Sequence, residues 1–215
     1  MKHIDRIGNL LPLGYVILVM IGIIRESVFF YQIGINILKY SSIMDILISP
    51  LATLTSHPIV LAAIILMIIL HFKLPDLLQK NDHKNWVRRL FELDKIKDKI
   101  SQEEQKNYYI IISIKTFFAV FFSFFLGFGI ADGYAVSNKI KNNELDYDCK
   151  LNFNTGESED VFLINTNTEY YFFVTKGSQT IKIAPIGSIK SIELTKNRAL
   201  NKSLQLPGKI NSRIY

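Results

Sequence analysis

The chain has 215 residues, of which 49% are hydrophobic, and a formal net charge of +6 at pH 7. The apolar residues are concentrated in the first 130 positions, a distribution typical of a membrane protein. The single cysteine, Cys149, excludes an internal disulfide, a cysteine metal cage and a CxxC redox pair. Much of the basic charge lies beside apolar runs, where membrane topology explains it, so we expect no direct nucleic-acid partner.

The first apolar run, residues 10–24, follows Lys2 and Arg6 in the order of a secretory signal peptide. It continues into Arg25 and Glu26 without a small-residue cleavage site, so we expect it to be retained as a membrane span. Charged residues at membrane depth are costly and often functional, which makes Arg25 and Glu26 candidates for an intramembrane polar site. Adjacent helical residues point about 100° apart, so we do not expect these two side chains to pair with each other. Two alternatives stay open for them. Either they anchor the helix at the membrane interface, or they face the bundle interior and pair between protomers.

Residues 32–55 are also apolar, but they carry Lys39, Asp45 and Pro50. Charges and a proline within such a stretch favour an interfacial or re-entrant segment. A fourth membrane span in this region is the alternative. The next aliphatic run, residues 59–70, is uninterrupted, and we expect it to form the second span.

These segments form an N-terminal membrane hairpin, residues 1–72, and a charged connector follows at residues 73–107. The connector carries nine Lys or Arg side chains. Lys and Arg gather on the cytoplasmic side of short membrane loops, so we expect the connector in the cytosol. With three spans, the segment after the last span is then outside. A fourth span would reverse this assignment, and it would suit the basic tail, residues 195–215, which follows Glu193 without an acidic residue.

Within the connector, apolar residues recur at helical spacing and form one stripe with a basic border that includes Arg88 and Arg89. Such a helix binds either the lipid headgroup zone or another protein, and both remain open. The acidic residues Glu92, Asp94 and Asp98 weaken a purely lipid interpretation. The residues of the stripe are Trp86, Leu90, Leu93, Ile96 and Ile100.

The third span is expected at residues 108–130, which contain seven phenylalanines between Lys115 and Gly129. Lys115 lies near the start of the span, where its ammonium group can reach the headgroups, and it is a third intramembrane polar candidate. Small residues in this span permit close approach of helices and predict a homo-oligomer. We expect four of them to face one way, namely Ala119, Ser123, Gly127 and Gly129.

The composition changes after Gly133, and residues 131–194 are predicted to form a small β domain. Five short runs rich in Val, Ile, Phe and Tyr alternate with turn-like segments such as NTGES and KGSQ. The expected fold class is therefore an α-helical membrane domain with three or four spans and a small antiparallel β module. The module is predicted to be an SH3-like or Sm-like barrel or a curled sheet.

The sequence contains no pattern that predicts catalysis. The four histidines stand apart, and HExxH, GxSxG and GxxxxGK[ST] motifs are absent. We therefore expect no enzyme, no catalytic or metal-binding residues and no cofactor.

The layout runs from IGNLLPLGYVILVMIGIIRESVFFYQIGINILKYSSIMDILISP, through a charged connector and a phenylalanine-rich last span, to a small β module. In outline this resembles the KwaA family, the membrane component of the Kiwa anti-phage defence system. The resemblance implies a homo-oligomer in the bacterial inner membrane that senses envelope disturbance and holds a cytosolic effector, KwaB. It brings no catalytic residues with it.

From the residues alone, the prediction is a multi-pass, non-enzymatic membrane sensor or scaffold with protein partners. A pore-forming or membrane-disrupting effector gated through the β domain is the alternative. That alternative needs a polar stripe along a span, for which Ser113, Thr116 and Ser123 are the candidates.

Overall fold

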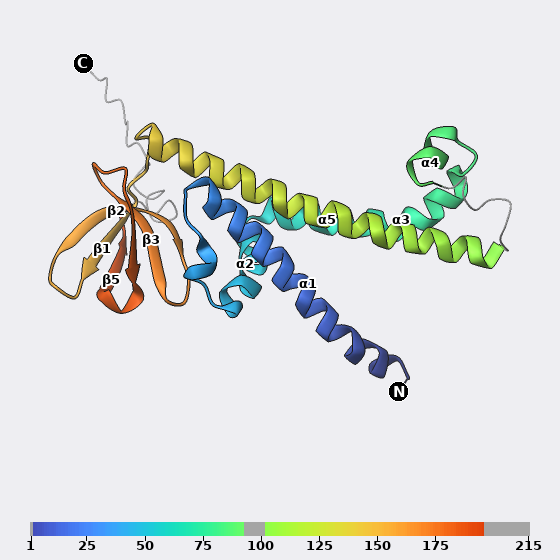
Figure 1. The fold of residues 1–215 in the computed structure, drawn as a ribbon, viewed down its shortest axis with the longest axis horizontal. Helices are drawn as coiled ribbons and strands as arrows, with labels where there is room; N and C mark the ends of the chain where they lie inside the picture. The colour runs from blue at the N-terminus through green and yellow to red at the C-terminus, as the bar shows by residue number, and fades with distance from the viewer. Residues whose placement is uncertain (1, 93–101, 196–215) are drawn as a thin grey trace, which may run out of the picture. The chain divides into compact units, whose positions relative to one another are not determined.

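The computed structural model describes residues 2–92 and 102–195. The chain divides into two compact units, which are described separately (Figure 1). The helical unit comprises Met1–Ile37 and Ile43–Gly133, and the sheet unit comprises Leu38–Ser42 and Tyr134–Tyr215.

Within the described residues, three helices are long and apolar enough to cross a membrane, as predicted, and they support a membrane protein. Their apolar stretches are Gly14–Gln32, Pro58–Asn81 and Glu104–Lys141. The predicted interfacial or re-entrant segment holds a 3₁₀ turn, Ile37–Lys39, and most of a helix of only 14 residues, Ile43–Ser56. At 1.5 Å per residue this helix extends about 21 Å, less than the roughly 30 Å of a hydrocarbon core. The helices are α1 (Lys2–Gln32), η1 (Ile37–Lys39), α2 (Ile43–Ser56), α3 (Pro58–Asn81), α4 (Asn85–Leu90) and α5 (Gln102–Lys141).

Helices α1 and α5 run parallel and approach each other closely at two glycines. A Cβ atom on Gly129 would lie 2.9 Å from the carbonyl oxygen of Arg25, and one on Gly133 would lie 2.5 Å from that of Phe29. Both pairs advance by four residues, so the same faces of the two helices stay in contact for a full turn. The absence of a side chain at these glycines allows the backbones to meet.

Helix α3 runs antiparallel to α5. The rings of His57 and Phe128 lie 5.7 Å apart and those of His71 and Phe117 lie 5.4 Å apart, so later residues of α3 meet earlier residues of α5. A cluster formed by Ile21, Ile64 and Phe125 joins α1, α3 and α5. The bundle is therefore held together by apolar contacts along its length.

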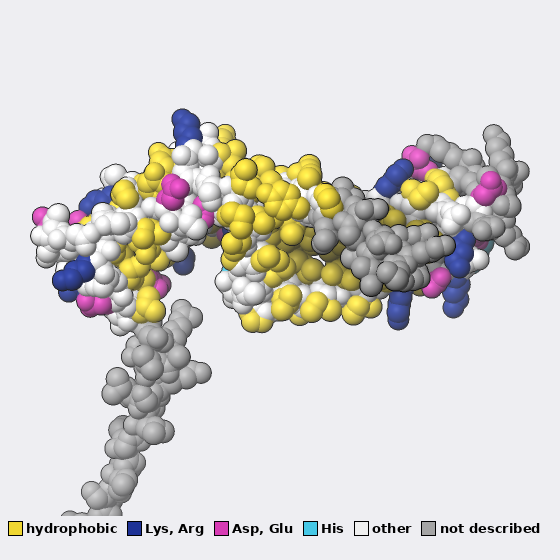
Figure 2. Space-filling model, turned by 90° about the horizontal axis from the view of Figure 1, so that it is seen from below, with side chains coloured by type: hydrophobic (Ala, Val, Ile, Leu, Met, Phe, Trp, Pro, Cys, Tyr) yellow, Lys and Arg dark blue, Asp and Glu magenta, His cyan; other side chains and the backbone are white. Residues whose placement is uncertain are grey.

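Most of the apolar surface of α3 is left uncovered. Only 6% of its apolar stretch is buried within the protein, and Ile59 and Phe72 are 85% and 82% exposed. Figure 2 shows hydrophobic side chains spread over the helices, with Lys and Arg gathered away from them. A helix in water needs a polar face, so this surface fits lipid surroundings.

Helix α5 is longer than the predicted third span and continues without a break to Lys141. It ends in a Schellman motif, in which Asn143 adopts a positive φ of 58° and the amide of Glu144 donates to the carbonyl of Lys139. The change in composition after Gly133 therefore does not end the helix. The residues between Gly133 and Asn142 are all compatible with a helical backbone.

The sheet unit contains the predicted five strands in one antiparallel sheet, ordered β4-β3-β2-β1-β5. The barrel alternative is wrong because β4 and β5 form no ladder in the described part of the unit. Strands β4 and β5 are consecutive in the chain, but the 3₁₀ turn η3 (Ile186–Ser188) separates them. The amide of Ile186 in this turn donates to the carbonyl oxygen of Glu169, just before β3. The sheet is open. The strands are β1 (Cys149–Phe153), β2 (Ser158–Thr166), β3 (Tyr170–Thr175), β4 (Ile181–Pro185) and β5 (Ile189–Leu194).

Both faces of β3, which lies beside the central strand β2, are covered. Phe173 belongs to a core cluster with Cys149, Leu151 and Val161. Its neighbour Phe172 is 1% exposed, and the ring of Tyr40 packs edge-on against it at 6.1 Å. The loop between α1 and α2 thus supplies a residue to the core of the sheet unit.

Candidate functional site

A cluster of charged and polar side chains joins three helices of the helical unit. It consists of Arg25 and Glu26 on α1, Ser49 on α2 and Asp132 on α5, and we refer to it as the charged cluster. Nη1 of Arg25 donates to Oε1 of Glu26, and it also lies 3.1 Å from Oγ of Ser49. The Ser49 hydroxyl in turn donates to the same carboxylate oxygen. The serine therefore bridges the two charges.

The expectation that Arg25 and Glu26 would not pair with each other is wrong. Their Cβ atoms diverge around the helix, but both side chains have several rotatable bonds and converge on Ser49 of α2. The pairing lies within one chain and faces the interior of the bundle. The structure thus favours interior pairing without a second protomer.

Asp132 extends the cluster to α5. Its Oδ2 lies 4.0 Å from Nη2 of Arg25. The close approach of α1 and α5 at Gly129 and Gly133 brings it there, because Asp132 lies on the turn between these two glycines. Sequence reasoning missed Asp132 and Ser49. For Asp132 the signal was present as GIADG, an acidic residue within a GxxxG pattern at the end of an apolar span.

Burial makes this cluster electrostatically demanding. The side chains of Arg25 and Glu26 are 14% and 8% exposed, whereas Asp132 is 38% exposed. Two further buried atoms, Nε of Arg25 and Oγ of Ser27, have no hydrogen-bond partner within the described residues. Taking charges out of water is costly unless each is well paired, so the cluster depends on its complete set of partners.

The depth of the cluster follows from the pairing of helices. His57, directly before α3, contacts Phe128, and the next residue of α5 is Gly129, which contacts Arg25. Arg25 is therefore level with the N-terminal end of the apolar helix α3. In a bilayer spanned by α3, the charged cluster lies at the membrane interface, facing inward.

Lys115 takes no part in this cluster. It lies on an exposed part of α5, about four turns before Gly129. This position fits the predicted extension of its ammonium group toward the headgroups.

The four small residues of the third span are divided between two faces of α5. Gly129 is buried against α1, whereas Ala119, Ser123 and Gly127 are exposed at steps of four residues, with open space beside Gly127. The expectation that all four face one way is wrong, because residues two apart point about 200° apart around a helix. The face of Gly129 is used within the chain, and the other face remains outward.

Part of the predicted connector stripe can be placed. Trp86 and Leu90 lie on α4 and are 64% and 66% exposed, and Arg89 is also exposed. Arg88 is half-buried, and Val87, absent from the predicted stripe, is the buried residue of α4. The remaining residues of the stripe, Leu93, Ile96 and Ile100, lie outside the described residues.

Chemically, the charged cluster pairs one guanidinium with two carboxylates and a hydroxyl. Across residues 2–92 and 102–195, no group of three or more His, Cys, Asp and Glu side chains is arranged to hold a metal ion. Comparison with models of protein families, with curated proteins and with solved structures found no match to this chain.

Proposed function

We propose that this chain is a multi-pass sensor and scaffold of the bacterial inner membrane, without enzymatic activity. In this proposal it forms a homo-oligomer, responds to disturbance of the envelope by phage and recruits a cytosolic effector. The membrane assignment is supported by the three apolar helices. The defence role and the effector follow from the resemblance of the sequence to the KwaA family.

The proposal depends most on how the chain connects the sheet unit, the proposed sensing domain, to the helical unit. The chain passes between the sheet unit and the helical unit at three points, 37/38, 42/43 and 133/134. The first point follows α1, the second precedes α2 and the third lies within α5. These are the three helices that meet in the charged cluster. A displacement of the sheet unit would therefore act on all three helices that carry the charged cluster.

A homo-oligomer would use the outward face of α5. Ala119, Ser123 and Gly127 are exposed there and leave room for a second helix backbone. Gly129 is engaged by α1 and is not available for this contact.

The test uses the gene in its native genomic context. We expect deletion of this gene to abolish resistance to phage. We also expect the tagged chain, crosslinked in native membranes and then solubilised gently, to carry both further copies of itself and a soluble protein encoded beside it. Unchanged resistance together with recovery of monomer alone would refute the proposal.

The pore-forming alternative has no support from the arrangement of polar residues in α5. Ser113 is buried and donates to the carbonyl oxygen of Tyr109, whereas Ser123 is exposed. Ser113, Thr116 and Ser123 point within about 80° of one another around the helix. Their exposure differs, so they do not form a continuous exposed polar stripe in the described structure. A sensor and scaffold should leave a reconstituted bilayer without conductance.

Sidedness is the second testable part of the proposal. With three spans and a cytosolic connector, the sheet unit is outside the cytosol. Native Cys149 is 5% exposed, and burial, assisted by Asp148, raises the pKa of its thiol to about 11, so it should react slowly with maleimide. We expect a membrane-impermeant maleimide on intact spheroplasts to label Lys190→Cys on β5 and to leave Arg89→Cys unlabelled until the cells are lysed. The reverse pattern would overturn the orientation.

A further inference from the structure

Helix α4 is fixed at one end of the membrane helices. Val87 is 2% exposed and forms a cluster with Leu78 of α3 and Tyr109 of α5. Only a few residues separate the end of α3 at Asn81 from the start of α4 at Asn85. The position of α4 is therefore set by the apolar helix that precedes it. If α3 spans the bilayer, α4 lies at its surface.

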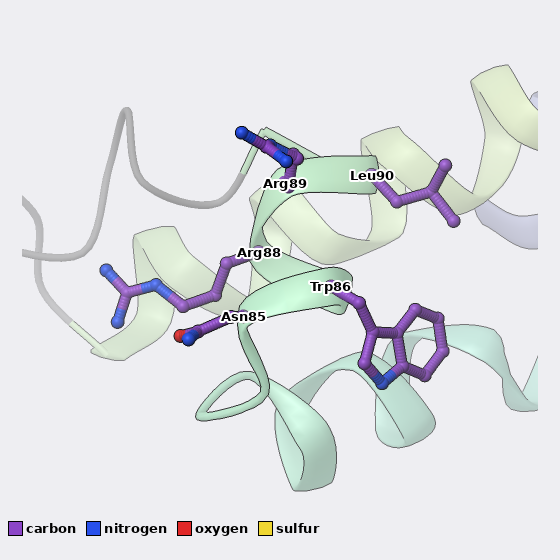
Figure 3. Close-up of a pocket in the computed structure, with 5 residues that line it drawn as sticks. All are labelled: Asn85, Trp86, Arg88, Arg89 and Leu90. Atoms are coloured by element: carbon purple, nitrogen blue, oxygen red, sulfur yellow. The ribbon is translucent and has the colours of Figure 1, made fainter.

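The exposed side of α4 has an apolar and a basic part. Trp86 and Leu90, four residues apart, are 64% and 66% exposed. Figure 3 shows both extending from one side of the helix, whereas Arg88 extends from the other. Arg89 is exposed beside them. Residues 80–91 hold four Lys or Arg side chains and one acidic residue, so the surroundings are basic.

Three surroundings could cover this surface, namely water, a protein and lipid. Water is unfavourable for a large indole beside a leucine. A bilayer surface suits both the apolar and the basic part of α4. Indole rings concentrate at the headgroup level, and anionic headgroups attract arginine. Helix α4 also packs directly on α3 through Val87 and Leu78, and the largely uncovered apolar surface of α3 favours lipid over a protein partner.

We propose that α4 is a binding element for anionic phospholipid. Trp86 and Leu90 enter the boundary between headgroups and acyl chains, and Arg89 binds the phosphate of an anionic lipid such as phosphatidylglycerol. The connector stripe is then divided, with α4 on the membrane, and an effector would bind elsewhere on the connector. The inference depends on membrane insertion of the helices and not on recruitment of an effector.

The test uses the intrinsic fluorescence of the full chain, because Trp86 is its single tryptophan. The protein is reconstituted into nanodiscs of phosphatidylcholine with or without phosphatidylglycerol, whose acyl chains carry bromine either near the headgroup or near the chain end. We expect strong quenching by the shallow bromine, weak quenching by the deep bromine and little quenching by aqueous iodide. Emission at the wavelength of tryptophan in water, with full quenching by iodide, would overturn the proposal and leave the surface to a protein partner.

Recognition of anionic lipid is tested separately with a variant of Arg89. In the second test, the shift of Trp86 emission to shorter wavelength is followed as the fraction of phosphatidylglycerol rises. Arg89→Gln should raise the fraction needed for half of this shift about fivefold, the effect of one basic side chain near an anionic surface. The matched control is Lys190→Gln, an exposed basic residue of β5, which should leave the titration unchanged. Equal spectra in both lipids, unaffected by Arg89→Gln, would overturn recognition of anionic lipid. Because no effector is present, these results stand apart from the test of the proposed function.

Discussion

Replacement of Glu26 by alanine is expected to lower the free energy of unfolding by about 3–5 kcal/mol, the usual cost of removing one partner of a buried ion pair. The Glu26 side chain is 8% exposed and accepts from both Arg25 and Ser49. Without it, the guanidinium keeps only Ser49 at 3.1 Å and Asp132 at 4.0 Å, and the Nε atom still has no partner within the described residues. Unfolding titrations in mixed micelles measure the change.

A glutamate of the sheet unit provides the control. Glu159 pairs with Lys182 at 2.9 Å, but the two side chains are 34% and 44% exposed. Its replacement by alanine should cost less than about 1 kcal/mol, because exposed ion pairs contribute little. The double variant Arg25→Met, Glu26→Leu should recover most of the loss, since it leaves no buried charge unpaired. A loss at Glu26 as small as that at Glu159 would contradict the burial of the charged cluster.

Local patterns in the sequence were sufficient to predict the three long apolar helices and the five strands, but not where α5 ends. Long apolar runs predict α1, α3 and α5, because a helix in lipid requires no polar face. Runs of aromatic and β-branched residues between turn segments predict the five strands. In both cases the relevant contacts lie within a few residues along the chain.

The pairings between distant segments were not predictable in this way. Closure of a barrel depends on whether β4 and β5 pair, and this depends on the path of η3 and not on the alternation within either strand. Asn167 donates to the carbonyl oxygen of Tyr40 across 127 positions, which no local pattern indicates. The charged cluster also depends on the parallel register of α1 and α5, which brings Asp132 to Arg25.

Two glycines of one helix are expected to respond to alanine with opposite signs. Gly127 has open space around it within one chain, so in the detergent-solubilised monomer Gly127→Ala should stabilise α5 by roughly 0.5–1 kcal/mol through the higher helix propensity of alanine. Gly133→Ala places a Cβ atom 2.5 Å from the carbonyl oxygen of Phe29, where backbone must shift. It should destabilise the helical unit by about 1–3 kcal/mol, the range found for overpacked interiors.

The opposite signs separate helix propensity from helix packing, because the substitution and the helix are the same. Thermal unfolding of the two variants in the same detergent gives the comparison. Gly133→Ala should also weaken the contact between Arg25 and Asp132, since that contact needs α5 close to α1. Its cost should therefore not add fully to that of Asp132→Asn in the double variant. Full additivity, or stabilisation at both glycines, would mean that α1 and α5 do not meet at Gly133 in the bilayer.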